Sequence, residues 1–131
     1  FAHHPTAIQE TLKALRMKYP GRRLWAIFEP RSNTTRRAVF QEELAKAFGD
    51  ADKVVISTAA KLEQIPQSER LDPLKLVDSI KSSGVEGEYL RDVPAIVEHV
   101  RTHSQPGDVV CFLSNGSFGG IHEQLLEALK A

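Results

Sequence analysis

The sequence has little cysteine, no excess of charge of either sign and no long apolar run. A single cysteine, Cys111, excludes an internal disulfide framework and a cysteine-rich zinc site. Seventeen lysines and arginines balance seventeen acidic residues, so the basic excess typical of a general nucleic-acid-binding protein is absent. The longest apolar run, Val109–Leu113, is far too short to span a bilayer. We therefore expect neither nucleic acid nor a membrane among the partners of this chain.

The length of 131 residues fits one domain, which we place at residues 1–131. The chain begins at Phe1, with neither an initiating methionine nor a signal peptide. We expect it to be a piece of a longer protein.

Short apolar runs predict four strands, and apolar residues at helical spacing predict five helices. The predicted strands are Leu24–Phe28, Lys53–Ser57, Glu88–Leu90 and Asp108–Leu113, and the predicted helices are Pro5–Tyr19, Thr35–Phe48, Pro73–Ser83, Val93–His103 and Gly120–Lys130. Strands that alternate with helices predict an α/β fold, a Rossmann-like, mainly parallel sheet with helices on both faces. Ligands of such sheets bind beyond the carboxyl ends of the strands, which directs attention to the segments after each strand, including the long connection Thr58–Leu71.

The segment after the first strand, Glu29–Arg37 (EPRSNTTRR), combines Arg31, Arg36 and Arg37 with Asn33 at an expected helix N-terminus. Free backbone N–H groups there favour an anion, and arginine forks match a carboxylate with two hydrogen bonds. A capped helix with solvated arginines explains the same residues. The position beyond a strand end favours an anion-binding role.

The segment after the last strand, Ser114–Gly120 (SNGSFGG), contains three glycines, which allow a backbone to approach a ligand closely. Its spacing matches neither the dinucleotide fingerprint nor a Walker phosphate loop. Candidate ligand contacts are Ser114, Asn115, Gly116, Ser117 and His122. The alternative is a tight turn that needs glycine for its backbone geometry.

The remaining candidates favour structural roles. His3 and His4 are adjacent, so they are poor joint metal ligands, and we expect no metal site in this chain. Cys111, Trp25 and Phe28 are predicted to lie in the core. No complete catalytic set is visible in the sequence.

Three segments together resemble the C-terminal domain of the Mur ligases. They are FAHHPTAI at 1–8, LWAIFEPRSNTTRRAVFQEEL at 24–44 and SNGSFGGIHEQLLEAL at 114–129. Within the family the resemblance is closest to the ligases that join UDP-N-acetylmuramate to the tripeptide L-Ala-γ-D-Glu-meso-diaminopimelate, and it covers essentially the whole chain. The residues after the Phe-x-Pro motif differ from those of the UDP-N-acetylmuramate–L-alanine ligases.

The resemblance implies the C-terminal domain of a three-domain, ATP-dependent, amide-forming ligase of peptidoglycan recycling in the bacterial cytoplasm. ATP and Mg²⁺ would be bound mainly by the central domain, so the isolated chain is expected to be inactive. The murein tripeptide would contact Arg31, Asn33, Arg36, Arg37 and the candidates at 114–117 and 122, whereas His3 and His4 would lie near the hinge and ATP. Two alternatives stay open: another Mur ligase, such as the L-alanine ligase, and a non-catalytic anion- or nucleotide-binding module.

Overall fold

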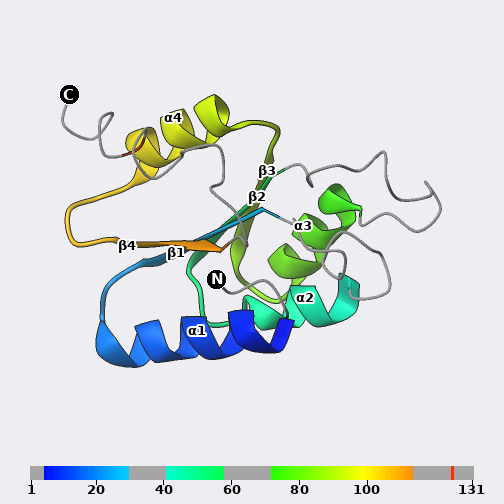
Figure 1. Ribbon diagram of the computed structural model, residues 1–131, viewed down its shortest axis with the longest axis horizontal. Helices are drawn as coiled ribbons and strands as arrows, with labels where there is room; N and C mark the ends of the chain where they lie inside the picture. The colour runs from blue at the N-terminus through cyan, green and yellow to red at the C-terminus, as the bar shows by residue number, and fades with distance from the viewer. Residues whose placement is uncertain (1–4, 30–40, 58–71, 114–124, 126–131) are drawn as a thin grey trace.

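The computed structural model describes residues 5–29, 41–57, 72–113 and 125, and these residues form a layered α/β fold (Figure 1). The elements are α1 (Pro5–Lys18), β1 (Leu24–Phe28), α2 (Gln41–Ala47), β2 (Lys53–Ser57), α3 (Pro73–Ser82), β3 (Glu86–Leu90), α4 (Val93–His103) and β4 (Val109–Leu113). None of the helices in these ranges has the length and apolar character needed to cross a membrane.

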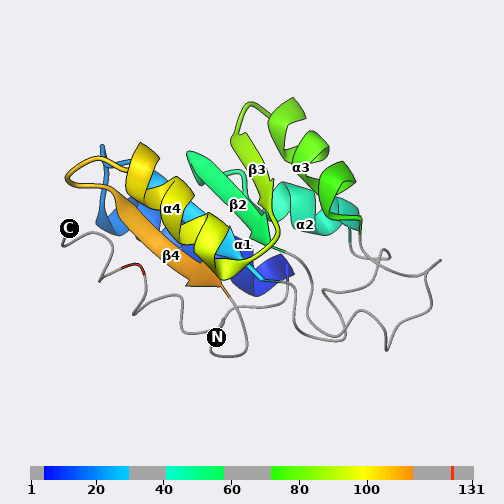
Figure 2. The same ribbon diagram turned by 90° about the horizontal axis from the view of Figure 1, so that it is seen from above.

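The four strands form one parallel sheet in the order β3-β2-β1-β4 (Figure 2). Following the chain, β2 and β3 are added one after the other on one side of β1. The chain then crosses back, and β4 pairs with the other side of β1. The predicted parallel α/β class is confirmed.

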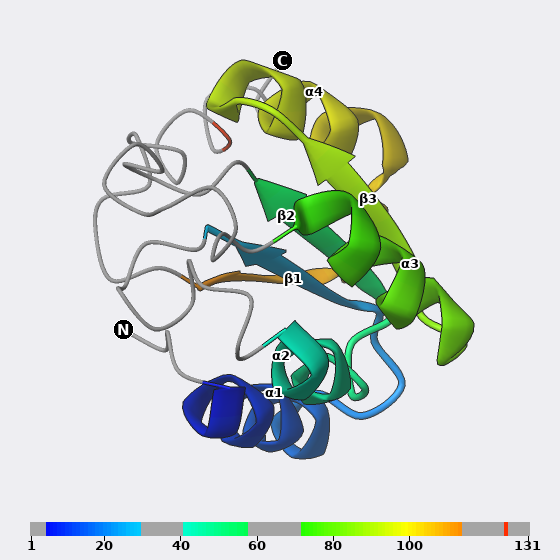
Figure 3. The same ribbon diagram turned by 90° about the vertical axis from the view of Figure 1, so that its right-hand side faces the viewer.

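One face of the sheet is covered by three helices, α1, α2 and α3. Their buried apolar side chains, among them Leu12, Leu44 and Ile80, pack with Ala26, Phe28 and other strand residues in one core cluster. The other face is covered by α4, whose Ile96 and Val100 pack with Trp25, Ile27 and Val55. Figure 3 shows the two layers on opposite sides of the sheet, as the sequence predicts. Leu125, on the predicted apolar face of the last helix, is buried in the α4 layer.

Two helices, α3 and α4, begin at aspartate N-caps. The Asp72 carboxylate accepts hydrogen bonds from the Leu74 and Lys75 N–H groups at 3.1 and 3.2 Å. The Asp92 carboxylate accepts one from the Ala95 N–H group at 2.9 Å. Each cap satisfies backbone donors that the first helical turn leaves unpaired.

The third strand begins at Glu86, two residues before its predicted start at Glu88. The prediction covered only the run Glu88–Leu90, and glycine is ordinarily unfavourable inside a strand. In the structure α3 lies so close that a Cβ atom at position 87 would be 3.3 Å from Val77 Cγ1, so a glycine fits this position. The helices Pro5–Lys18 and Pro73–Ser82 each end one residue before the predicted end, and β4 begins one residue after its predicted start.

Candidate functional site

The strand order reverses between β1 and β4, and such a reversal is where open α/β sheets bind ligands. The two strands pair in register, with Phe28 opposite Leu113 at their carboxyl ends. The Glu29 N–H group donates to the Leu113 carbonyl at 3.0 Å, which extends the pairing one residue beyond the strands. The chain therefore leaves the sheet after β1 and after β4 from directly neighbouring positions.

The base of this reversal point is buried and closely packed. Every residue of β1 is buried, and the side chains of Phe28 and Leu113 are fully inaccessible to solvent. The Phe28 ring packs against Phe48 of α2 with 5.5 Å between ring centroids. A buried polar side chain, Ser57, ends the neighbouring strand β2. A ligand bound beyond these strand ends would therefore lie next to buried, packed side chains.

The candidate residues predicted from the sequence all lie outside the described residues. They are His3, His4, Arg31, Asn33, Arg36, Arg37, Ser114, Asn115, Gly116, Ser117 and His122. The long connection Thr58–Leu71 lies outside them too. What the described residues contribute is topology: both predicted ligand-binding segments, Glu29–Arg37 and Ser114–Gly120, start at the two strand ends that flank the reversal point.

The opposite, amino end of the same two strands carries a dense polar cluster around Asp108, which we call the Asp108 cluster (Arg23, Trp25, Gln105 and Asp108). The Asp108 carboxylate accepts hydrogen bonds from Arg23 Nε at 3.1 Å and Arg23 Nη2 at 2.8 Å. It also accepts from Trp25 Nε1 at 2.9 Å and from the Gln105 N–H group at 3.0 Å. The Asp108 side chain is only 7% exposed. The cluster joins β1, β4 and the turn between α4 and β4.

The electrostatics of Asp108 follow from this geometry. Burial by itself would raise the pKa of the carboxyl group, but the hydrogen bonds from Arg23, Gln105 and Trp25 outweigh it and lower the pKa to about 2. Asp52 in the turn before β2 behaves similarly but is more exposed. Burial opposes ionisation there, and the hydrogen bonds from Arg16 and the Leu24 N–H group nevertheless lower its pKa. Both carboxylates are therefore charged, structural groups.

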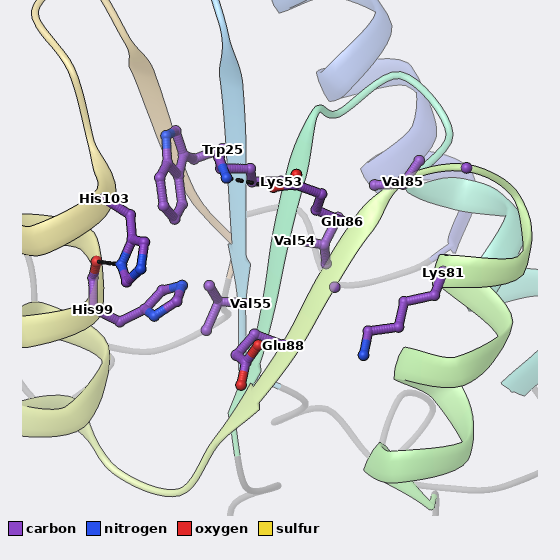
Figure 4. Close-up of a pocket in the computed structure, with 12 residues that line it drawn as sticks. Trp25, Lys53, Val54, Val55, Lys81, Val85, Glu86, Glu88, His99 and His103 are labelled. Carbon is purple, nitrogen blue, oxygen red and sulfur yellow. Dashed lines mark hydrogen bonds and ion pairs between the residues drawn. The ribbon is translucent and has the colours of Figure 1, made fainter.

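A cavity of about 480 Å³ lies beside the Asp108 cluster, between α4 and the amino ends of β1, β2 and β3. Trp25, Lys53, Glu88, His99 and His103 are among its lining residues (Figure 4). Sequence reasoning missed His99 and His103, although their spacing of four residues in a predicted helix places them on one face. The cavity lies at the wrong end of the strands for the ligand site of a parallel α/β sheet.

The described residues contain neither a reactive cysteine nor an enclosed metal site. Burial raises the pKa of the Cys111 thiol to about 11, so this cysteine stays protonated and packs as a small apolar side chain, as predicted. Within residues 5–29, 41–57, 72–113 and 125, no three His, Cys, Asp or Glu side chains are grouped to hold a metal ion.

The pattern of strands and reversal point has counterparts among known proteins. A family model described as "Mur ligase, glutamate ligase domain" matches residues 1–116. The chain belongs to this Mur ligase family. The resemblance of the three sequence segments is thereby confirmed, and it holds over most of the chain.

Relatives and solved structures refine the family assignment. The UDP-N-acetylmuramate–L-alanyl-γ-D-glutamyl-meso-2,6-diaminoheptandioate ligase of Escherichia coli K12 is 38% identical over 98% of this Mur ligase chain and 26% of its own length. The crystal structure of a murein peptide ligase from Psychrobacter arcticus 273-4 is also 38% identical, with a TM-score of 0.77 over 98% of this chain and 26% of that one. This Mur ligase chain thus spans about a quarter of the length of these relatives.

A third match is close to this chain in length. It is a crystallised domain of a UDP-N-acetylmuramate:tripeptide ligase from Haemophilus ducreyi 35000HP, 34% identical, with a TM-score of 0.73. The match covers 98% of this chain and 86% of that one. A related domain of nearly this size therefore folds well enough to crystallise by itself.

Proposed function

We propose that this chain is the peptide-binding domain of an ATP-dependent ligase that joins UDP-N-acetylmuramate to L-Ala-γ-D-Glu-meso-diaminopimelate in peptidoglycan recycling. The observation that carries the proposal is the strand reversal between β1 and β4, which brings the bases of the two predicted ligand-binding segments together. The names of the relatives with 38% identity supply the substrate class. The enzyme would work in the bacterial cytoplasm, where nucleotide-linked precursors of the cell wall are made.

The part of the reaction assigned to this domain is positioning. An acyl phosphate formed from the muramate carboxylate and ATP would be attacked by the peptide amine, with release of phosphate and formation of an amide. Holding the amine in line with a reactive acyl group supplies much of the rate of such a step. Closure of the domain over the site would exclude the water that competes with the amine.

The chain itself is not suited to hold ATP and Mg²⁺. Its sequence has no Gly-Lys-Ser/Thr phosphate loop. The described residues contain no grouped carboxylates or histidines that could enclose a cation. ATP and Mg²⁺ would therefore be bound mainly by the central domain of the intact enzyme, with His3 and His4 on the side of the hinge.

We expect the isolated chain to melt cooperatively and to release no ADP when both substrates are present. Robust ADP release would contradict this assignment.

The peptide offers several carboxylates, and the segment after β1 offers Arg31, Arg36 and Arg37 with Asn33. Charge-assisted, two-point hydrogen bonds make arginine the suitable partner for a carboxylate. Arg31 comes three residues after the strand end, and we assign it the principal contact. The segment after β4, with Ser114, Asn115, Gly116, Ser117 and His122, would hold the diaminopimelate end of the peptide.

The test is Arg31→Ala in the intact enzyme, with Arg101→Ala as the matched control. Arg101 is exposed on the last turn of α4, far from the carboxyl edge of the sheet, where it pairs with Glu98. A hydrogen bond to a charged group contributes about 1.5–3 kcal/mol, so kcat/KM for the tripeptide should fall by about ten- to hundredfold in the Arg31 variant only. Unchanged tripeptide kinetics would refute the role of Arg31.

The same assay separates the alternatives. A Mur ligase for L-alanine would turn over the single amino acid in preference to the tripeptide. A non-catalytic anion-binding module would be contained in a protein that hydrolyses no ATP with either amine. The residues after Phe28, which match the tripeptide ligases, favour the tripeptide.

A further inference from the structure

His99 and His103 lie one turn apart on α4 and face the cavity at the amino end of the sheet (Figure 4). Their ring centroids are 4.3 Å apart, and the ring planes differ by 32°. The His99 and Trp25 rings also form a T-shaped contact, with 5.9 Å between their centroids. The fully buried Trp25, which the Asp108 cluster holds in place, therefore limits the positions that the His99 ring can adopt.

The His103 ring has a defined orientation. Its Nδ1 atom lies 2.9 Å from the His99 carbonyl oxygen. A carbonyl only accepts hydrogen bonds, so Nδ1 carries the proton and Nε2 is the ring nitrogen left for a metal ion. A histidine that binds a metal through one nitrogen commonly donates its other N–H to a backbone carbonyl in this way.

The charges around the pair are compatible with a bound cation. Glu88 of the neighbouring strand β3 also lines the cavity. Lys53 lines the cavity as well, and it forms an ion pair with Glu86. Lys81 also lines the cavity, but it comes from α3, which packs on the opposite face of the sheet from α4. Burial, His103 and Lys53 lower the pKa of His99, against an opposing effect of Glu88.

We propose that His99 and His103 together bind one divalent transition-metal ion of the Zn²⁺ class, at a site remote from the peptide-binding edge. Two histidines at positions i and i+4 of a helix present two nitrogen ligands on one face, as in helical zinc sites. No third ligand is grouped with them among the described residues, so water would complete an open coordination sphere. Glu88 supplies attraction without a bond to the ion. This inference does not depend on the proposed ligase function.

The experiment is a calorimetric titration of the chain with Zn²⁺ at pH 7.5, in a His3→Ala/His4→Ala background that removes the other paired histidines. The crystallised Haemophilus domain of similar length supports the use of the isolated chain. We expect one Zn²⁺ per chain and no binding of Mg²⁺, which prefers oxygen ligands. His103→Ala should weaken Zn²⁺ binding by about tenfold or more, because loss of a second-shell partner alone costs about 10–100-fold.

Two further variants keep the test decisive. His103→Gln changes an exposed side chain, so a folded protein is expected, and thermal melting checks it. Glu88→Gln should weaken binding by only about two- to tenfold, because it removes a nearby charge and leaves both ligands in place. The proposal would be overturned if the Zn²⁺ affinity were the same with and without His103. It would also be overturned if the background chain did not bind Zn²⁺ at 1 mM, which is about the weakest affinity that we would count as a site.

Discussion

The two ends of the sheet are built differently. At the amino end, two aspartates with lowered pKa values fasten the strands to the turns around them. At the carboxyl end, β1 and β4 finish on the fully buried Phe28 and Leu113, with no charged side chain within either strand. The segments rich in arginine and glycine begin immediately beyond. Polar groups at the amino end thus stabilise the fold, whereas those beyond the carboxyl end are the ones that we propose for a ligand.

Among the substitutions that test this difference between the two ends, Asp108→Ala should have the largest effect. The substitution leaves the buried Trp25 Nε1 and the Gln105 N–H group without their acceptor. The unpaired buried indole N–H of Trp25 and the loss of the charged partner of Arg23 should lower the free energy of unfolding by about 2–4 kcal/mol. Chemical denaturation measures the loss. Asp78→Ala, on an exposed position of α3, is the control and should change stability by less than about 0.5 kcal/mol. Equal losses of stability in Asp108→Ala and Asp78→Ala would contradict a stabilising role for the Asp108 cluster.

Acid provides the next test of the same carboxylate. The pKa of Asp108 is about 2 in the folded chain against an ordinary value of 3.8, so the unfolded chain takes up the proton first as the pH falls. The stabilisation is complete above about pH 5 and is lost as the pH falls from about 4 to 2, with a total of about 2 kcal/mol. The stability difference between wild type and Asp108→Ala should shrink by that amount over this range. A difference independent of pH would show that the charge of Asp108 is not what stabilises the strands.

A smaller effect is expected at the carboxyl end, from Asn115→Ala in the intact enzyme. If Asn115 contacts the diaminopimelate residue, kcat/KM for the tripeptide should fall by about three- to tenfold, the value of one neutral hydrogen bond. A peptide that lacks diaminopimelate should be used as well as before, and the melting temperature should not move. An equal loss on both peptides would favour the alternative of a structural turn at Ser114–Gly120.

The smallest effect is expected from Asp52→Asn. Asp52 accepts hydrogen bonds from the Leu24 N–H group and from Arg16, both at 2.7 Å, but 43% of its side chain is exposed. Exposed ion pairs contribute about 0.2–1 kcal/mol, so denaturation should show a loss in that range. A loss as large as that of Asp108→Ala would mean that burial does not distinguish the two carboxylates.

The sequence predicted the class of the fold because the apolar patterns and the alternation of strands with helices agree. It missed the start of β3 because the close approach of α3 to Gly87 is a tertiary contact with no local signal. It placed Trp25 in the core correctly, yet the hydrogen bond from Trp25 to Asp108 spans 83 residues and could not be read locally. The neighbouring positions of the two candidate segments likewise depend on the strand order, which the sequence alone does not fix.

Hydrogen exchange of the intact enzyme, with and without the tripeptide, tests the division between the two ends most directly. Bound peptide should slow exchange in the segments directly after Phe28 and Leu113. It should leave exchange unchanged at the amino end, from Gly84 to Gly87 and from His99 to Asp108, around the cavity. Protection that appears at the amino end and not after Phe28 and Leu113 would contradict the account.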